Sequence, residues 1–292
     1  MKEITLRQLL LFDWTKPILS KLFLLWQAVK KFDDDNGLFL SSGVAFSLLI
    51  CLVPFFLLLL SLVGTYLYSD REVLNLIHRY LESAVPTLDP RMMKNIFGII
   101  EHRKIVGGLG IVGLIWTSTW VFSSLRTALN KVFQVEKNRG ILRGKAIDLL
   151  MILLAGTFLL MSMVLTSLIT YLQRYRFNFS LDLWPIIHFS LKYLIPFFFT
   201  FWMFFLIYKI VPSEKIPFKV ALQAASFASL LWEVAKQWFG WYVLHLGRFS
   251  VVYGSLSALF IFFLWIYYSS AILILGGEVA FLLEKGGDES QG

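Results

Sequence analysis

The 292-residue sequence has little charge and almost no cysteine. Asp, Glu, Lys and Arg make up 16% of the chain, whereas soluble domains carry about 25% charged residues. Hydrophobic residues reach 58%. Cys51 is the single cysteine, which excludes an intrachain disulfide and a cysteine-based metal site. This composition is typical of an integral membrane protein.

The motifs that usually mark an enzyme are also missing. The four histidines are scattered and form no His-x-His, HExxH or DxxH pattern that would hold a metal. Ser41–Ser47 lacks the Gly-x-Ser-x-Gly pattern of a nucleophile elbow. Gly107–Gly113 is rich in glycine, but it follows no strand, as a dinucleotide-binding loop would. We therefore expect neither an enzyme nor a cofactor, and no metal.

Six apolar stretches are long enough to cross ~30 Å of hydrocarbon. The second is diluted by four glycines, which membrane helices tolerate better than soluble ones. The expected fold class is all-α: a polytopic membrane protein whose membrane domain covers residues 38–284. The six predicted transmembrane helices are Leu38–Tyr68, Ile105–Leu125, Ile147–Leu172, Ile187–Tyr208, Phe218–Trp241 and Tyr253–Leu283.

Lys and Arg residues between the spans predict the orientation. They concentrate in the N-terminal segment 1–37, in the connection 126–146 and in the connection before the fifth span. These segments share one side with the tail 285–292, so the positive-inside rule places both termini in the cytoplasm. The N-terminal segment mixes acids and bases and has no short apolar core, so we do not expect a cleavable signal peptide.

Two segments outside the spans have amphipathic patterns. Ile18–Lys31 repeats apolar residues at helical spacing and predicts a helix lying in the cytoplasmic interface. The connection 69–104 reads as two short amphipathic helices broken at Pro86 and Pro90. They would form a small helical cap facing outward.

Glu233 and Lys236 are charged residues inside the fifth predicted span. Glu233 lies 14 residues past Lys219, or roughly 21 Å along a helix, which places it in the outer leaflet. One interpretation is an ion pair near the lipid headgroups, beside an aromatic belt. The other is a polar cavity in the bundle, lined by Glu233, Lys236, Gln237 and Glu278, because an acid within the membrane is usually functional. For Glu278, near the inner end of the last span, an interfacial position is the first expectation and a hydrogen bond between helices the second.

Small residues suggest which helices pack closely. Ala221, Ala225 and Ser229 precede Glu233 at every fourth position, so one side of this helix could approach a neighbour closely. Gly43 and Ser47 form a matching row on the first span. We expect these two helices to meet.

The connection 126–146 is strongly basic. The positive-inside effect explains its charge, and a nucleic-acid site is not expected. Binding of anionic lipid headgroups is a second interpretation. The residues that would contact headgroups are Arg126, Lys131, Arg139 and Arg143.

Several stretches resemble the YihY/virulence factor BrkB family. Gly37–Gly64 resembles its first-span signature, and Trp116–Lys145 resembles its second motif. The C-terminal third is most similar, with Tyr208, Lys236 and Glu278 where the family pattern has them. The resemblance covers about Gly37 to Ala280. One departure is Ala224–Ala225, where the family often has Gly-Ala.

The resemblance implies a six-helix protein of the bacterial inner membrane. A ribonuclease activity once attributed to members is regarded as mistaken, and some members are linked to envelope integrity and lipid traffic. Our first hypothesis is a protein that assists transport of lipid or another amphiphile. The alternative is a scaffold that binds envelope proteins without transporting. The expected partners are membrane lipids and envelope proteins.

Overall fold

The computed structural model describes residues 23–67, 102–135, 140–174, 194–246 and 255–289. These residues are helical, with turns and short connections, and contain no strand. The N-terminal helix covers residues 23–34. The longer helices are α2 (Gly37–Leu67), α5 (Arg103–Val132), α6 (Ile141–Arg174), α8 (Ile195–Ile210), α9 (Phe218–Leu246) and α11 (Ser255–Glu289). The all-α prediction is confirmed for this part of the chain.

Three of the helices are long and apolar enough to cross a membrane. They are Gly37–Leu62 within α2, Arg103–Val132, and Leu259–Gly286 within α11. The predicted third, fourth and fifth spans fall on α6, α8 and α9, and their membrane crossing stays a prediction. Residues 68–101, which hold nearly all of the predicted cap, lie outside the described residues, as do residues 18–22 of the predicted interfacial helix.

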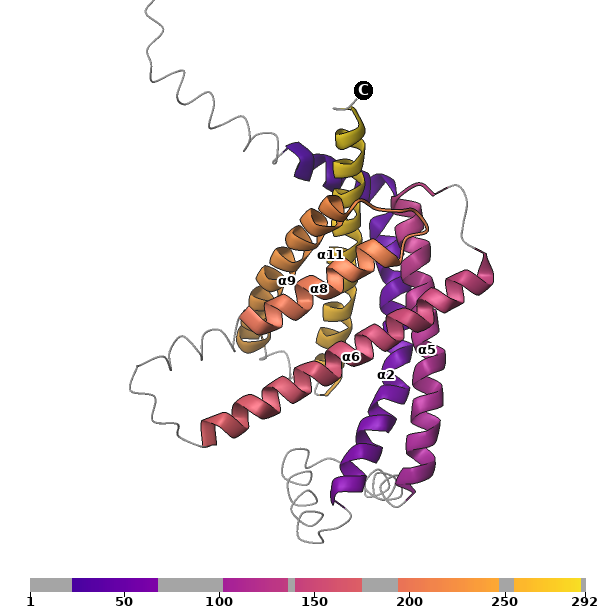
Figure 1. The fold of residues 1–292 in the computed structure, drawn as a ribbon. Coiled ribbons are helices and arrows are strands. Elements are labelled where there is room, and N and C mark those ends of the chain that lie inside the picture. The colour runs from indigo at the N-terminus through magenta and orange to yellow at the C-terminus, as the bar shows by residue number, and fades with distance from the viewer. Residues whose placement is uncertain (1–22, 68–101, 136–139, 175–193, 247–254, 290–292) are drawn as a thin grey trace, which may run out of the picture. The chain divides into compact units, whose positions relative to one another are not determined.

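The chain divides into two compact units. One contains residues 1–45 and 122–292, and the other contains residues 46–121. The second unit is a helical pair, formed by the later part of α2 and the earlier part of α5, which run side by side (Figure 1).

Glycines of α5 bring the two helices of this pair close together. A Cβ at Gly110 would lie 3.2 Å from the backbone nitrogen of Leu58, and one at Gly113 would lie 3.1 Å from the Cβ of Pro54. The order of these contacts is antiparallel. Small residues allow such close approach of backbones. Gly107, Gly110 and Gly113 therefore form a packing face, whereas a Cβ at Gly108 would meet nothing within 4 Å.

In the other unit, α9 packs against both α8 and α11 (Figure 1). Aromatic side chains occupy these contacts. The Trp232 and Trp265 ring centroids are 5.1 Å apart, and those of Phe239 and Trp265 are 4.6 Å apart. Tyr208 on α8 is fully buried, and its hydroxyl donates a hydrogen bond to the Leu273 carbonyl at 2.9 Å. This bond anchors α8 to α11.

Gly276 and Gly277 allow three neighbouring helices to approach α11 closely. A Cβ at Gly276 would overlap the Tyr208 hydroxyl and lie 2.9 Å from Ala228 Cβ on α9. A Cβ at Gly277 would lie 2.9 Å from Leu129 on α5. The glycine pair thus places α5, α8 and α9 around one turn of α11, immediately before Glu278.

Candidate functional site

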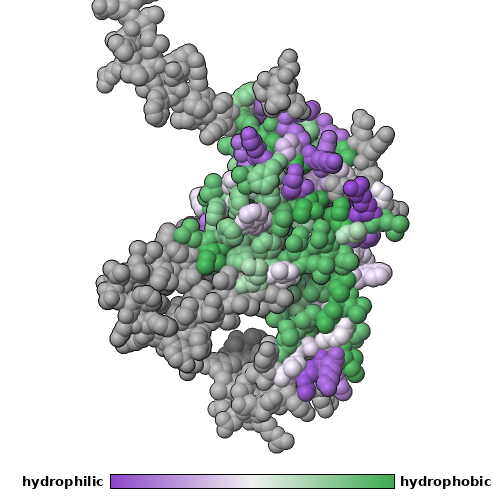
Figure 2. Space-filling view, viewed as in Figure 1, coloured by the Kyte–Doolittle hydropathy of each residue, from purple (hydrophilic) through white to green (hydrophobic). Residues whose placement is uncertain are grey.

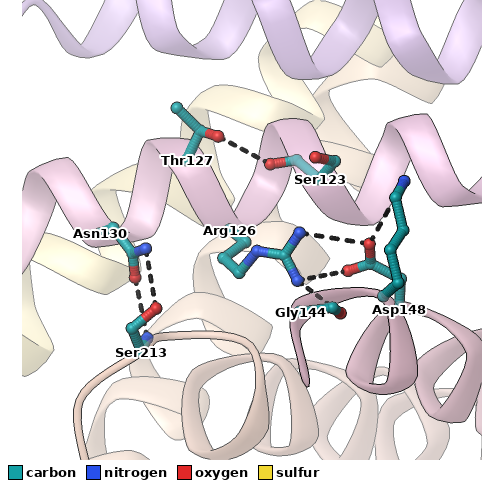
Figure 3. A network of polar contacts seen from close by, with 8 residues as sticks. Ser123, Arg126, Thr127, Asn130, Gly144, Asp148 and Ser213 are labelled. Carbon is teal, nitrogen blue, oxygen red and sulfur yellow. Dashed lines mark hydrogen bonds and ion pairs between the residues drawn. The ribbon is translucent and has the colours of Figure 1, made fainter. Parts of the chain in front are cut away.

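Polar side chains join the helices of the larger unit at the end of α5. Arg126 donates from Nη1 to Asp148 Oδ1 at 2.8 Å and from Nη2 to Oδ2 at 3.2 Å, linking α5 to α6 (Figure 3). It also donates to the Gly144 carbonyl at 2.6 Å. Asp148 is buried, and the Lys145 ammonium lies 3.9 Å from its Oδ2. The Arg126 guanidinium is thus neutralised inside the protein.

Asn130, one turn further along α5, holds the connection between α8 and α9. Its amide nitrogen donates to Ser213 Oγ at 2.9 Å, and its Oδ1 accepts from the Ser213 backbone amide at 2.8 Å (Figure 3). Helix α5 ends just beyond it, where Gln134 has φ 53° and the Val135 amide donates to the Asn130 carbonyl at 2.9 Å. This left-handed C-terminal cap ends the helix at the polar end of α5.

The N-terminal helix is attached to the same region through Lys31. Its ammonium donates to Glu278 Oε2 at 2.7 Å, to Asp35 Oδ2 at 2.5 Å and to the Val132 carbonyl at 2.9 Å. It also lies 4.2 Å from the centroid of the Phe281 ring. Glu278 is fully buried. One lysine therefore connects the N-terminal helix to both α5 and α11.

Glu233 and Lys236 form a different kind of pair. Lys236 Nζ donates to Glu233 Oε2 at 2.6 Å, and Gln237 Nε2 donates to Glu233 Oε1 at 3.1 Å. Side-chain exposure is 28% for Glu233 and 43% for Lys236. Among the described residues, these contacts stay within α9. Trp238 and Trp241 are exposed nearby, as is typical of a membrane interface.

The structure separates the residues predicted to line one cavity. Glu278 bonds to Lys31, whereas Glu233 bonds to Lys236 and Gln237. The two acids therefore belong to two polar groups, one buried and one exposed. Lys131 and Arg143 are exposed, in contrast to Arg126, and Arg139 lies outside the described residues.

The small-residue row of α9 is buried, whereas its predicted counterpart is mixed. Ala221, Ala225 and Ser229 are fully buried. Gly43 is exposed, with nothing within 4 Å of the position a Cβ would take, while Ser47 is buried. The contact of this row with the first span stays a prediction. The close neighbour found for this side of α9 is α11, through Ala228 and Gly276.

Asp148 and Lys31 were not singled out by the sequence interpretation. Asp148 has a recognisable signal, because it is the only acid within the predicted span Ile147–Leu172. Lys31 resembles any other interfacial lysine. Its partner Glu278 lies 247 residues away, so no local pattern could connect them.

Comparison with known proteins identifies the family. The pattern of the family Virulence factor BrkB matches residues 28–292. The chain belongs to this family. The match begins before Gly37, so it includes Lys31 as well as Glu278. No solved structure matches the chain.

Three relatives cover most of the chain. The UPF0761 membrane protein of Cronobacter sakazakii is 27% identical over 92% of this chain and 90% of its own length. The UPF0761 membrane protein YihY of Salmonella typhimurium has the same identity and coverage. A Bacillus subtilis protein named putative ribonuclease-like protein YfkH is 26% identical over 84% of this chain and 89% of its own length. Two of these names describe a membrane protein, and the third carries the ribonuclease-like name.

The described residues contain no cluster of possible metal ligands. No group of three or more His, Cys, Asp or Glu side chains in this part of the chain could hold a metal ion. The family match and the relatives make this chain a membrane protein of the BrkB family. Its described residues hold buried ion pairs at helix contacts and one exposed pair on α9.

Proposed function

We propose that this protein assists the movement of an anionic lipid, or another amphiphile with an anionic headgroup, in the bacterial inner membrane. The observation that carries the proposal is the exposed Glu233–Lys236 pair. Unlike the Arg126–Asp148 pair, it joins no two helices among the described residues. The contacts between the described helices therefore do not account for this pair.

The surroundings of the pair suit an amphiphile. Leu230, Val234 and Trp238 are exposed on α9 around the charged side chains. Hydrophobic residues cover much of the described surface on the face shown in Figure 2. Lys236 is the more exposed partner, so its ammonium can reach a phosphate oxygen while Glu233 keeps it oriented. Acyl tails would remain against the apolar side chains.

The basic side chains at the opposite, cytoplasmic end would collect headgroups. Lys131 at the end of α5 and Arg143 in the first turn of α6 are exposed, and each basic residue near an anionic surface contributes about 1 kcal/mol of attraction. Arg126 takes no part, because Asp148 and Gly144 already occupy its guanidinium. Arg139, outside the described residues, remains a candidate from the sequence.

A vesicle assay tests this function. Purified full-length protein is reconstituted into liposomes, and the crossing of a labelled anionic lipid is followed by quenching from outside. We expect crossing to be faster than in protein-free liposomes and to fall strongly for Lys236→Met and Glu233→Gln. Lys219→Met is the matched control, because Lys219 is an exposed lysine on the same helix.

Two outcomes would contradict the proposal. Equal crossing rates with and without protein would exclude lipid movement as the function of this protein. Normal crossing rates for Lys236→Met and Glu233→Gln would show that the pair has no role in lipid movement. They would favour the scaffold hypothesis. That hypothesis predicts that deletion within residues 69–104 abolishes function, while both substitutions preserve it.

A further inference from the structure

A polar cluster away from the Glu233–Lys236 pair has an unbalanced charge. Lys31, Asp35 and Glu278 place two carboxylates around one ammonium. The side chains of Lys31 and Asp35 are each 14% exposed, and Glu278 is fully buried. If all three are ionised, the cluster keeps one uncompensated negative charge in a place with little water, which is unfavourable.

One oxygen of this cluster is unpartnered. Glu278 Oε1 is buried and accepts no hydrogen bond from the described residues. Lys31 cannot supply one, because its three N–H groups already have three acceptors: Asp35, Glu278 Oε2 and the Val132 carbonyl. A carboxylate oxygen in this position needs a donor or a proton.

We propose that Glu278 binds a proton, and that this proton sets how firmly the N-terminal helix is held against α5 and α11. The proton comes from water and adds to the carboxylate, leaving a neutral carboxyl beside a balanced Lys31–Asp35 pair. The ammonium then loses its charged partner on α11. It keeps Asp35, on its own side, and the Val132 carbonyl on α5.

No other charged or titratable group among the described residues around Glu278 is placed to act as the proton-binding acid. The Tyr208 hydroxyl on α8 donates a hydrogen bond to the Leu273 carbonyl, and the Lys285 ammonium lies 4.7 Å from the centroid of the Phe281 ring. Glu284 lies six positions further along α11 and is half-buried. On the remaining neighbours, Lys131 of α5 and Lys219 of α9 are exposed. Glu278 is the buried acid that the helix contact depends on.

Infrared difference spectroscopy of the full-length protein in lipid nanodiscs can detect the proton. We expect a protonated carboxyl band that appears as the pH is lowered and is missing from Glu278→Gln. Asp35→Asn removes the competing carboxylate, so Glu278 becomes the one carboxylate paired with the Lys31 ammonium among the described residues. The ionised form of Glu278 is then favoured, and the pH midpoint of the carboxyl band moves at least about one unit toward acid. Asp34→Asn, an exposed acid on the same helix, is the matched control and leaves the midpoint unchanged.

Pulsed EPR reports the helix contact. In a Cys51→Ser background, spin labels at the exposed positions Lys30→Cys and Gly286→Cys measure the separation of the N-terminal helix from the end of α11. We expect a narrow distance distribution at high pH. As the pH is lowered, the distribution should broaden with the same midpoint as the carboxyl band in the infrared spectra. In Glu278→Gln it is broad at every pH.

The outcomes are decisive even if Glu278→Gln fails to fold. A midpoint that Asp35→Asn leaves in place overturns the proposal, as does the absence of any titrating carboxyl band in the unsubstituted protein. If the distance distribution does not change with pH, protonation of Glu278 is not coupled to the position of the N-terminal helix. None of these readouts requires lipid movement, so they stand apart from the vesicle assay.

Discussion

Removing the carboxylate of Asp148 should be among the most damaging single changes to the described part of the chain. Asp148 receives two hydrogen bonds from Arg126, whose side chain is only 15% exposed. Breaking a buried ion pair by removing one partner costs about 3–5 kcal/mol, because the other charge stays buried. Arg126 keeps its bond to the Gly144 carbonyl, so Asp148→Leu should cost about 3 kcal/mol, at the lower end of that range.

The double variant provides the internal control. In Arg126→Met/Asp148→Leu neither charge remains, and apolar replacements of a buried pair are often neutral or stabilising. We expect its free energy of unfolding to lie within about 1 kcal/mol of the unsubstituted protein, so the coupling energy is large and favourable. Arg143→Met, an exposed arginine in the first turn of α6, should change stability by less than about 0.5 kcal/mol.

Unfolding in mixed micelles with increasing SDS, followed by tryptophan fluorescence, measures these differences. A loss of 3 kcal/mol corresponds to roughly a hundredfold change in the unfolding equilibrium, which such a titration resolves easily. If Asp148→Leu costs less than about 1 kcal/mol, or if the double variant is as unstable as the two single variants added together, the ion pair does not hold α5 to α6.

Three further substitutions test contacts between helices, and two of them have a matched control. Gly110→Val should cost about 1–3 kcal/mol, because its Cβ meets the backbone of α2; Gly108→Ala, where a Cβ meets nothing, should be neutral or stabilising, and both are read by the same SDS titration. Gly276→Ala should lower the midpoint of thermal unfolding, whereas Gly240→Ala, which has open space, should not; equal midpoints would contradict the packing of α8 and α9 on α11. Asn130→Ala should cost about 1 kcal/mol and speed amide hydrogen exchange in the α8–α9 connection; unchanged exchange there would show that Asn130 does not hold it.

The helices could be predicted from the sequence because hydrocarbon imposes a simple rule. Every backbone polar group must be satisfied within the helix, so a long apolar stretch is a helix whatever surrounds it. The stretch Ile147–Leu172 falls in α6 and Phe218–Trp241 in α9. The same rule does not predict which helices contact one another. The glycines of Gly107–Gly113 showed only dilution in the sequence, and their contact with α2 is visible only in three dimensions.

The polar sites were partly predictable for a related reason. A charge within an apolar run is conspicuous, so Glu233, Lys236 and Glu278 were identified as candidates. Their partners depend on tertiary structure. The Lys236 partner lies three residues away, and the expected pair was found. The partner of Glu278 lies in the N-terminal helix, and the partner of Arg126 lies on the next helix. Sequence spacing cannot pair residues that far apart.

The division between structural and functional charges follows from how helices associate in lipid. Apolar side chains gain little by leaving lipid for one another, so small residues and polar contacts determine which helices pack. Arg126–Asp148 and Lys31–Glu278 each join two elements and are explained in this way. Two features remain after that explanation: the exposed Glu233–Lys236 pair, and the unpartnered oxygen of Glu278. Neither joins two helices among the described residues. An amphiphile at the first and a proton at the second are the uses that we propose for them.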